Sequence, residues 1–328
     1  MRSKMYHFSY SSVFAQEITE YVELKQVMGL WFRTAAENLH RFDRLCVELD
    51  IQAAELTDAL ISVWVAPRPG ESKNTRAARI NALKGFADFL NSKGAHIKWP
   101  CIHQSWQGQP EFVPYIFTFN EVVRILEVAD TQPLPANGSQ FHIIFPAILR
   151  VLYGTGLRIS EALHLKNTDV DLQRGLLTIW NSKFDNSRRI PISASLRDEL
   201  LKYEEQLKRP QKCVYFFPNS KGEPYSQRTV YDKFRDVLWQ SGIPHGSGRK
   251  GPRVHDFRHT FAVHSLQKCA DAGIDTYTFL PVLATYLGHK RVSTTEKYLR
   301  LTAEAHPAFL KKATVLSDMI IPEVQEYE

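Results

Sequence analysis

Four segments in the second half of the chain carry side chains that could act on a phosphodiester. They are Tyr153-Gly-Thr-Gly-Leu-Arg-Ile-Ser-Glu-Ala-Leu163, a strand-like pair around Lys183, His255-Asp-Phe-Arg-His-Thr-Phe-Ala262 and Leu287-Gly-His-Lys-Arg-Val-Ser-Thr-Thr-Glu-Lys-Tyr298. Guanidinium groups bind non-bridging phosphate oxygens and neutralise the charge that develops in a transition state. A phenol, with a pKa of about 10, needs a base or cationic surroundings to attack, and a lysine can protonate the departing oxygen.

Each of these residues also has an ordinary structural role. Arg158 suits a helix start, His255 suits a helix cap, and the Tyr298 ring suits a core. His255 and Arg258 are three positions apart, so on a helix they share a face. The combination therefore indicates phosphodiester transfer by a tyrosine. No carboxylate cluster suited to Mg²⁺ accompanies it, so we expect neither a metal nor a cofactor.

The elements that must position these residues follow from the apolar pattern. Helical spacing covers residues 22–28, 34–49, 57–65 and 74–91, and a Pro- and Gly-rich linker begins near residue 94. The capping box Thr118-Phe-Asn-Glu121 then opens a second helical series. We therefore expect a helical domain over residues 1–112 and a second domain over 113–328.

The second domain contains the only convincing β signal. Residues 175–192 alternate as a hairpin with Lys183 near its tip, and residues 214–217 predict a short extra strand. A helix is expected over 226–240, with Gly242 after its end. A capping box at Ser293-Thr-Thr-Glu296 would place Tyr298 in the second turn of a new helix. The expected fold is mainly α with a small β-sheet.

Composition places the chain among ordinary globular proteins. Its 328 residues suit two domains, and 41 Lys and Arg against 35 Asp and Glu give a net charge of +6, which permits an anionic partner such as nucleic acid. The four cysteines lie far apart without a C-x-x-C pair, which disfavours disulfides and cysteine zinc sites. No apolar run approaches 18 residues, so we expect a reduced, cytoplasmic protein without membrane contact.

The motif set resembles the tyrosine recombinases, the phage integrase and Xer superfamily. In that family Arg, Lys, His-x-x-Arg, His or Trp, and Tyr occur in this order. The resemblance assigns the catalytic positions to Arg158, Lys183, His255, Arg258, His289 and Tyr298. Glu161 matches the accessory acid that orients the arginine. The likeness covers roughly residues 15–312, and the first third resembles the all-α, SAM-like core-binding domain through its helix pattern.

The resemblance implies a mechanism. Tyr298 would attack the scissile phosphate and form a 3′-phosphotyrosyl link while the two arginines clamp the phosphate. Lys183 would protonate the 5′-oxygen, His255 would assist proton transfer at the tyrosine, and His289 would hydrogen-bond the phosphate. Four protomers would exchange strands between two DNA duplexes, bound at inverted-repeat core sites, through a Holliday junction. Accessory directionality factors are candidate further partners.

Several basic residues are candidates for DNA contacts, with a solvated surface as the alternative reading of each. In the family, the helix that starts near Ser226 enters the major groove. The candidates are Lys73, Arg76 and Arg79 in the first domain, Gln227, Arg228 and Tyr231 in that helix, and Arg249 and Lys250 in a Gly-rich loop. Residues 306–321 predict a tail helix that docks either on a neighbouring protomer or on its own domain.

One catalytic position departs from the family pattern. The usual Gly-Lys-Gly turn at the lysine is replaced by Asn-Ser-Lys-Phe-Asp-Asn-Ser, and Arg188 and Arg189 lie close by on the returning strand. This makes Lys183 the least certain of the assignments.

Alternative functions remain open at this point. We favour a recombinase of a mobile element over an Xer-like chromosome dimer resolvase, a type IB topoisomerase-like enzyme or a catalytically inactive DNA-binding relative. A zinc hydrolase is a remote alternative: His255 and His259 have zincin spacing, but Asp256 stands in place of Glu and Arg258 would repel the metal.

Overall fold

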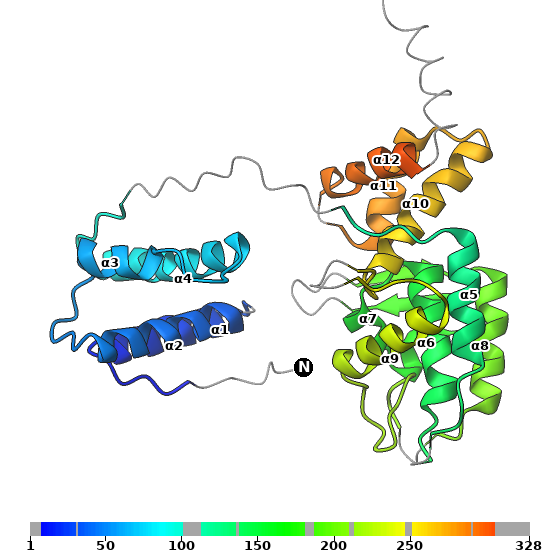
Figure 1. Cartoon of the computed structure of the whole chain (residues 1–328), viewed down its shortest axis with the longest axis horizontal. Coiled ribbons are helices and arrows are strands. Elements are labelled where there is room, and N and C mark those ends of the chain that lie inside the picture. Colours follow the sequence, from blue (N-terminus) through cyan, green and yellow to red (C-terminus); the bar gives the residue numbers. More distant parts are fainter. Residues whose placement is uncertain are drawn as a thin grey trace, which may run out of the picture. The chain divides into compact units, whose positions relative to one another are not determined.

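The computed structural model divides into two compact units, one containing helices α1–α4 and the other containing every element from α5 to α12 (Figure 1). The structure describes residues 8–30, 32–100, 113–135, 138–180, 187–209, 213–246, 251–289 and 291–305. The predictions for Lys183, Arg249, Lys250 and the tail from residue 306 lie outside these ranges, as does the end of the expected linker.

The first unit is a bundle of four helices. Their bounds are Ala15–Val27 for α1, Arg33–Glu48 for α2, Asp58–Val65 for α3 and Lys73–Ser92 for α4. The helices predicted over residues 34–49, 57–65 and 74–91 are confirmed to within one or two residues at each end, whereas α1 extends well before residue 22. The side chains of Thr57 and Ser72 accept hydrogen bonds from backbone N–H groups and thereby cap α3 and α4.

The core of this unit is aromatic. Phe14, Phe42, Trp64 and Phe86 are fully buried, and Phe42 meets Trp64 edge to face with ring centroids 5.3 Å apart. Such contacts add about 0.5–1.5 kcal/mol to the burial of each pair. Phe86 of α4, the helix that carries the expected DNA-contacting arginines, meets Phe14 edge to face with ring centroids 6.2 Å apart, and α4 packs against α1, α2 and α3.

The placement of Arg79 corrects one sequence prediction. Its side chain is only 1% exposed, and it donates hydrogen bonds to both carboxylate oxygens of Glu71 at 2.9 and 2.7 Å and to the carbonyl of Ala66 at 3.0 Å. The guanidinium also lies over the Trp64 ring. A buried arginine with a bidentate partner is a structural element, so Arg79 does not contact phosphate.

The second unit is mostly helical, with one small sheet. The helices are α5 Phe119–Asp130, α6 Phe141–Thr155, α7 Ile159–Leu163, α8 Ala194–Gln206, α9 Gln227–Gln240, α10 Asp256–Asp271, α11 Thr276–Leu287 and α12 Ser293–Ala305, with a 3₁₀ turn at Asn167–Asp169. The predicted capping box of α5 is present, because Thr118 and Glu121 each bond the other's backbone N–H. The predicted fold class is thus confirmed.

The sheet is antiparallel in the order β1-β2-β3. Its strands are β1 Val170–Asp171, β2 Leu176–Ile179 and β3 Arg188–Pro191, and Leu177 pairs with Ile190 across the hairpin. The predicted hairpin is confirmed, and β1 is an additional strand. The strand expected over residues 214–217 is wrong, because Tyr215 forms only an isolated bridge with Lys166.

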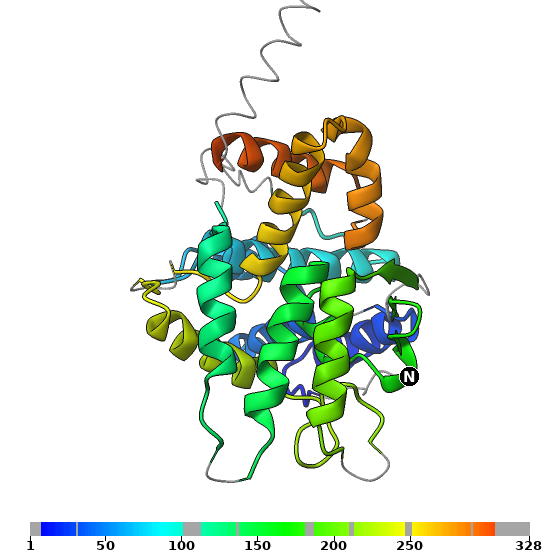
Figure 2. The same cartoon turned by 90° about the vertical axis from the view of Figure 1, so that its right-hand side faces the viewer.

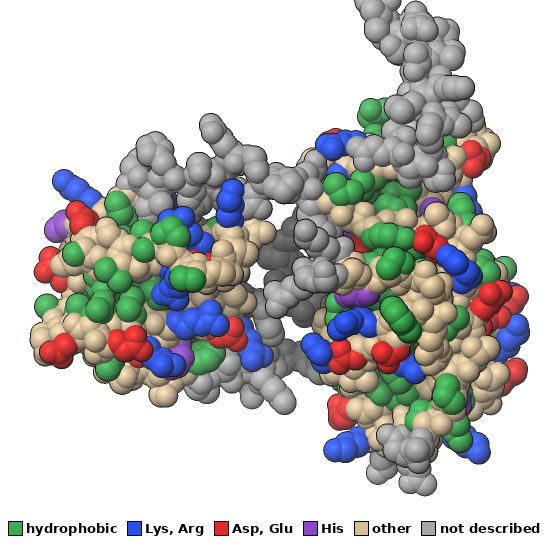
Figure 3. All heavy atoms as spheres, viewed as in Figure 1, with side chains coloured by type: hydrophobic (Ala, Val, Ile, Leu, Met, Phe, Trp, Pro, Cys, Tyr) green, Lys and Arg blue, Asp and Glu red, His purple; other side chains and the backbone are tan. Residues whose placement is uncertain are grey.

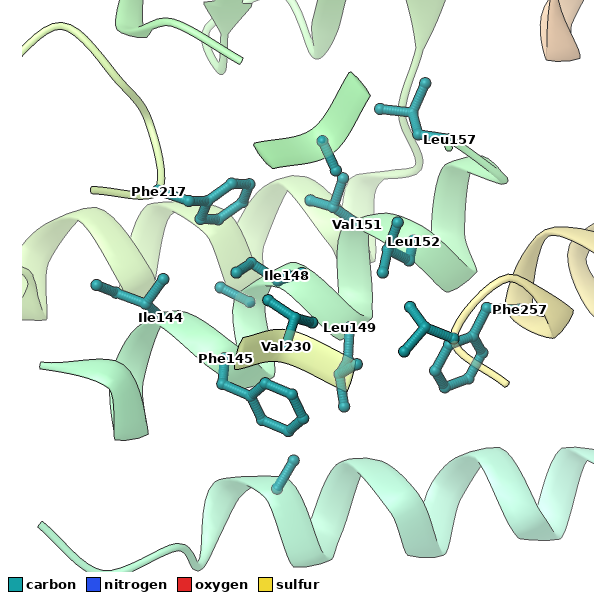
Figure 4. Packing of buried hydrophobic residues seen from close by; sticks show 14 of the residues in the cluster. Ile144, Phe145, Ile148, Leu149, Val151, Leu152, Leu157, Phe217, Val230 and Phe257 are labelled. Carbon is teal, nitrogen blue, oxygen red and sulfur yellow. The ribbon is translucent and has the colours of Figure 1, made fainter. Parts of the chain in front are cut away.

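Helix α6 forms the centre of the second unit. It is apolar over most of its surface, apart from His142 and the ion-paired Arg150, and Ile144, Phe145, Ile148, Leu149, Val151 and Leu152 point from it toward surrounding elements (Figure 4). A helix with so wide an apolar surface must be buried. Accordingly α5 and α8 lie side by side with α6 (Figure 2), and Phe257 of α10 packs into the same core. The C-terminal end of α6 leads directly to Arg158.

Helices α10, α11 and α12 gather at one end of this unit (Figures 1 and 2). Leucines of α10 and α11 enclose the ring of Tyr298 on α12 in a separate small core. The capping box predicted at Ser293 is wrong: Ser293 is already helical, and Val292 accepts the N–H groups of both Thr295 and Glu296. The prediction that Tyr298 lies in the second turn is nevertheless correct.

Candidate active site

Glu161 holds two arginines at one edge of the site. Its Oε1 accepts hydrogen bonds from Arg158 at 3.0 Å and from Arg188 at 3.2 Å, and its Oε2 accepts from Arg188 and from the backbone N–H of Arg158. Burial would raise the pKa of Glu161, but the hydrogen bonds and charges of Arg188, followed by those of Arg158, lower it. The carboxylate therefore stays ionised and fixes both guanidinium groups.

The two arginines differ in access. The Arg158 side chain is 40% exposed, whereas Arg188 is 12% exposed and also donates to the carbonyl of Tyr286 at 2.9 Å. Tyr286 in turn donates its hydroxyl to the carbonyl of Pro191 on β3. Arg188 thus ties strand β3 to the end of α11 and leaves Arg158 as the guanidinium that solvent or a phosphate can reach.

Arg258 joins the loops on either side of the site. Its guanidinium donates to the carbonyl of Gly156 at 2.7 Å and to the carbonyl of Leu287 at 2.8 Å. Five N–H groups are available on a guanidinium, so three remain for a substrate. Burial, followed by the charge of Arg158, lowers the pKa of Arg258 to about 10, so it is still a cation at neutral pH.

Two glycines allow these loops to approach so closely. Gly156 has a φ of +62°, and a Cβ there would lie 2.5 Å from the Phe261 ring. Gly288 has a φ of +69°, and a Cβ there would lie 2.8 Å from a nitrogen of Arg188. Only glycine fits both the left-handed backbone and the space. This explains why glycine occupies position 156, two residues before Arg158, and position 288, directly before His289.

His289 is held beside Tyr298. Its Nδ1 lies 2.8 Å from the hydroxyl of Thr295, and its ring stacks on the ring of Tyr298 with a centroid separation of 6.2 Å. Because Nδ1 is engaged, Nε2 is the ring nitrogen left for a ligand. Burial, followed by the charges of Arg258 and Arg158, lowers the pKa of His289 to about 4.

Tyr298 is almost fully enclosed, with 1% of its surface exposed. Its hydroxyl lies 3.0 Å from Nδ1 of His259 on α10. Burial raises the pKa of Tyr298, while the charges of Arg258 and Arg158 act in the opposite direction. The phenol therefore lies within the electrostatic reach of both guanidinium groups, as a nucleophile of this chemistry requires.

His255 is exposed at the start of α10. Its ring meets the ring of His259 edge to face, with centroids 5.0 Å apart. Desolvation by the surrounding protein, followed by the charges of Arg258 and Arg253, lowers the pKa of His255 to about 4.

The zinc alternative needs a third ligand beside His255 and His259, and no metal-binding group of three occurs among the residues described. Nδ1 of His259 is, moreover, bonded to Tyr298.

The structure thus gathers five of the six predicted catalytic residues, with Lys183 outside the described ranges. The predicted DNA-contacting residues that the structure describes lie on α4 and α9. Lys73 and Gln227 are exposed, Arg76 donates to the carbonyl of Val65, and Arg228 forms a surface ion pair with Asp232.

Surface charge is mixed on the face seen in Figure 3. Lys and Arg side chains alternate there with Asp and Glu on the unit at the right. Tyr231, the remaining candidate on α9, is half-buried. Among the described residues, Arg158 and Arg188 are brought together by their shared partner Glu161.

Two residues were not assigned a catalytic-site role from the sequence. Arg188 was noticed only as a neighbour of Lys183, although strand alternation places it on the same face as the buried Ile190. His259 was weighed only as a zinc ligand, although its spacing from His255 on one helix placed it near the site. In the described part of the chain, no helix is long and apolar enough to cross a membrane.

Stability should depend on pH through the buried His259 and the half-buried His289. The pKa of His259 is lowered by burial and then by His255, from 6.5 to about 3, and that of His289 from 6.5 to about 4. The unfolded chain therefore binds more protons below pH 6.5, so stability is complete above that pH and falls toward pH 4. The expected slope is up to about 1.4 kcal/mol per pH unit for each histidine.

Urea unfolding at pH 7.5 and pH 5 measures this effect. The variant His259→Gln should lose less stability than the wild type over that interval, because glutamine does not titrate. An equal loss in the two proteins would show that His259 does not contribute. Glu161, whose lowered pKa starts from 4.5, loses its contribution only below this interval.

The sequence of this chain is similar to those of known proteins. A profile described as the phage integrase family matches residues 116–305. The chain is 28% identical over 308 residues to a putative integrase/recombinase, y4rB, of Sinorhizobium fredii, covering 92% of this chain and 96% of that protein. It is 30% identical over 246 residues to tyrosine recombinase XerA of Pyrococcus furiosus, covering 74% of each.

A solved structure shares the fold. The XerH site-specific recombinase, bound to palindromic difH substrate in a post-cleavage complex, aligns with a TM-score of 0.64 at 21% identity, covering 94% of this chain and 92% of that one. The family profile spans more than half of the chain and includes Arg158, Arg258, His289 and Tyr298. The chain therefore belongs to the phage integrase family, the tyrosine recombinases, and is an enzyme that cuts and rejoins DNA at specific sites.

Proposed function

We propose that Tyr298 is the nucleophile of this recombinase and becomes joined to the 3′-phosphate of a cut DNA strand, leaving a free 5′-hydroxyl. Arg158 and Arg258 bind the non-bridging oxygens, and His289 donates to the same phosphate. The observation that carries this proposal is the location of the phenol: its ring stacks on that of His289, its hydroxyl lies 3.0 Å from Nδ1 of His259, and the charges of both arginines act on it. Glu161 keeps Arg158 oriented.

Two further roles complete the reaction. Lys183, assigned from the order of the motifs, protonates the 5′-oxygen as it leaves, and His255 assists proton transfer from the open end of α10. The energy of the phosphodiester is retained in the tyrosyl link, so rejoining needs no ATP. No metal or cofactor enters this scheme.

We assign DNA binding to both parts of the chain. The core-binding domain, residues 1–112, and the catalytic domain, residues 113–328, hold the duplex together, as the basic excess allows. The proposed contacts are Lys73, Arg76, Gln227, Arg228, Tyr231, Arg249 and Lys250. Lysine and arginine contacts of this kind make affinity fall steeply with salt.

The assembly follows from the chemistry. Complete exchange between two duplexes breaks four strands, and each break consumes one Tyr298, so four protomers act on two duplexes through a Holliday junction. The palindromic substrate named for XerH supports inverted-repeat core sites. We place the reaction in the cytoplasm.

The biological role we propose is that of a mobile-element integrase, with accessory directionality factors as further partners. Its support is the likeness to y4rB, which extends over 92% of this chain. An Xer-like resolvase of chromosome dimers is the second candidate, supported by the likeness to XerA. Mapping the bound DNA in cells separates them: ends of an excised element favour the first role, and one site near the replication terminus favours the second.

A nicked duplex tests the chemistry. A nick close to the cleavage point lets the short 5′-hydroxyl fragment diffuse away, so the covalent complex accumulates. Peptide mapping should find DNA on Tyr298; an adduct on another residue, or none, would overturn the assignment. Two marked duplexes then distinguish exchange of strands from relaxation of supercoils, the product expected of a type IB topoisomerase-like enzyme.

A further inference from the structure

The hydroxyl of the proposed nucleophile already has a hydrogen-bond partner. Tyr298 Oη lies 3.0 Å from Nδ1 of His259, and both side chains are buried between α10 and α12. With the imidazole proton on Nε2, the lone pair of Nδ1 accepts the phenolic hydrogen. A base at this distance satisfies the geometric requirement for proton abstraction.

We propose that His259 is a catalytic residue of DNA cleavage, whose Nδ1 positions the Tyr298 hydroxyl and takes its proton as the oxygen attacks phosphorus. The proposal rests on the function proposed above for Tyr298, and it replaces His255 as the group that receives this proton.

The step balances without any further reactant. The Oη–H bond breaks and the proton moves to Nδ1, the Oη–P bond forms, and the P–O5′ bond breaks. The departing 5′-oxygen takes a proton from the general acid, which we assign to Lys183. In rejoining, the 5′-hydroxyl attacks phosphorus and gives its proton back to the neutral amine that served as general acid. The Oη–P bond breaks, and the imidazolium returns its proton to the departing phenolate oxygen.

The other two histidines are placed differently. His289 stacks on the phenol ring and directs its Nδ1 to Thr295. His255 lies at the exposed start of α10 and faces the His259 ring, with centroids 5.0 Å apart. Among the described residues, His259 is the one whose side chain lies within hydrogen-bond distance of the reacting oxygen.

The charges around His259 make its proton affinity depend on whether DNA is bound. In the free protein, burial and then the charges of His255, Lys297, Arg253 and Arg258 lower the pKa of His259 to about 3. It is therefore neutral at pH 7, and its Nδ1 lone pair is directed at the phenolic hydrogen. A DNA phosphate between the guanidinium groups brings negative charge, which offsets these cations and raises the proton affinity of the imidazole. His259 becomes an effective base when DNA is bound.

The first test is His259→Ala on the nicked duplex. General base catalysis contributes about 10²–10⁴-fold, so adduct formation should slow by at least about 100-fold while DNA affinity stays within about twofold. The matched control is His264→Ala on the same helix, because Nδ1 of the buried His264 lies 3.0 Å from the hydroxyl of the half-buried Tyr153. It should cleave at the wild-type rate. Wild-type cleavage by His259→Ala overturns the proposal.

A chemical rescue separates proton removal from packing. A fluorinated tyrosine at position 298 lowers the phenol pKa and so reduces the need for a base. It should restore cleavage at least tenfold more in His259→Ala than in the wild type. The variant His259→Gln, which keeps an acceptor but is not a base, should show the same rescue and guards against misfolding of the alanine variant. Equal effects in variant and wild type overturn the proposal.

A substrate with a 5′-bridging sulfur locates the defect on the correct side of phosphorus. Sulfur leaves without a proton, so this substrate should restore cleavage by Lys183→Ala but not by His259→Ala. Restoration of His259→Ala would assign His259 to the leaving group and overturn the inference. The wild-type adduct on Tyr298 is measured in the same experiment, so failure of the proposed nucleophile is recognised separately.

Discussion

Tyr298→Phe is expected to form no covalent DNA adduct while still binding the duplex. The change removes the one oxygen that could bond to phosphorus and leaves the aromatic ring in the core of α10, α11 and α12. Arg158, Arg258 and His289 keep their partners, so the phosphate-binding cations remain. The measurement is adduct formation on the nicked duplex, together with binding to an intact duplex at the same salt concentration.

The same substitution should also weaken the fold. Phenylalanine leaves Nδ1 of the buried His259 without the hydroxyl that it contacts. Loss of a partner by a buried polar atom costs about 1–3 kcal/mol. We therefore expect a lower urea midpoint, and cleavage must be measured where both proteins are folded.

Tyr153→Phe is the matched control. It removes the hydroxyl that lies 3.0 Å from the buried His264, another contact between α10 and a tyrosine, here a half-buried one outside the arginine cluster. This variant should lose comparable stability and keep the adduct. An adduct that survives in Tyr298→Phe, or that disappears equally in Tyr153→Phe, would show that the effect is structural rather than chemical.

The sequence indicated candidate site residues but not the contacts that hold them. The order of the motifs, and the family resemblance that they carry, single out Arg158, Arg258, His289 and Tyr298 as candidates, and the structure brings these four side chains together. The partners are set by tertiary packing: nothing in the local pattern shows that Arg258 would bond the carbonyls of Gly156 and Leu287. Such contacts join residues more than 25 positions apart.

Helical periodicity predicted the elements well but misjudged particular surfaces. The positive residues of α4 read as one solvated stripe, yet Arg79 is buried because Glu71, in the preceding loop, supplies a bidentate partner. Similarly, the capping signature at Ser293 does not start α12, because Val292 closes the first turn through its own carbonyl. Both errors arise where a long-range or backbone interaction replaces the local one that the pattern suggests.

Arg258→Lys is expected to lower the rate of adduct formation by about 10²–10³-fold, the range found when one transition-state donor is removed. A guanidinium serves two carbonyls and a phosphate at once because its donors form a planar fork. An ammonium group has three donors on a single nitrogen and cannot reach Gly156, Leu287 and the substrate together. Burial beside the Arg158 charge also favours its neutral form, which would remove the cation altogether.

A control variant separates the effect of Arg258→Lys on stability from its effect on cleavage. Arg150→Lys is the matched control: Arg150 bonds both oxygens of Asp130 at 2.8 and 2.7 Å, and it lies outside the motif segments. That variant should lose stability without losing cleavage. If Arg258→Lys cleaves within about fivefold of the wild type, the fork is not needed. A large loss restricted to this variant would mean that the carbonyl contacts and the phosphate contact are inseparable, so that the same guanidinium both closes the loops around the site and binds the substrate.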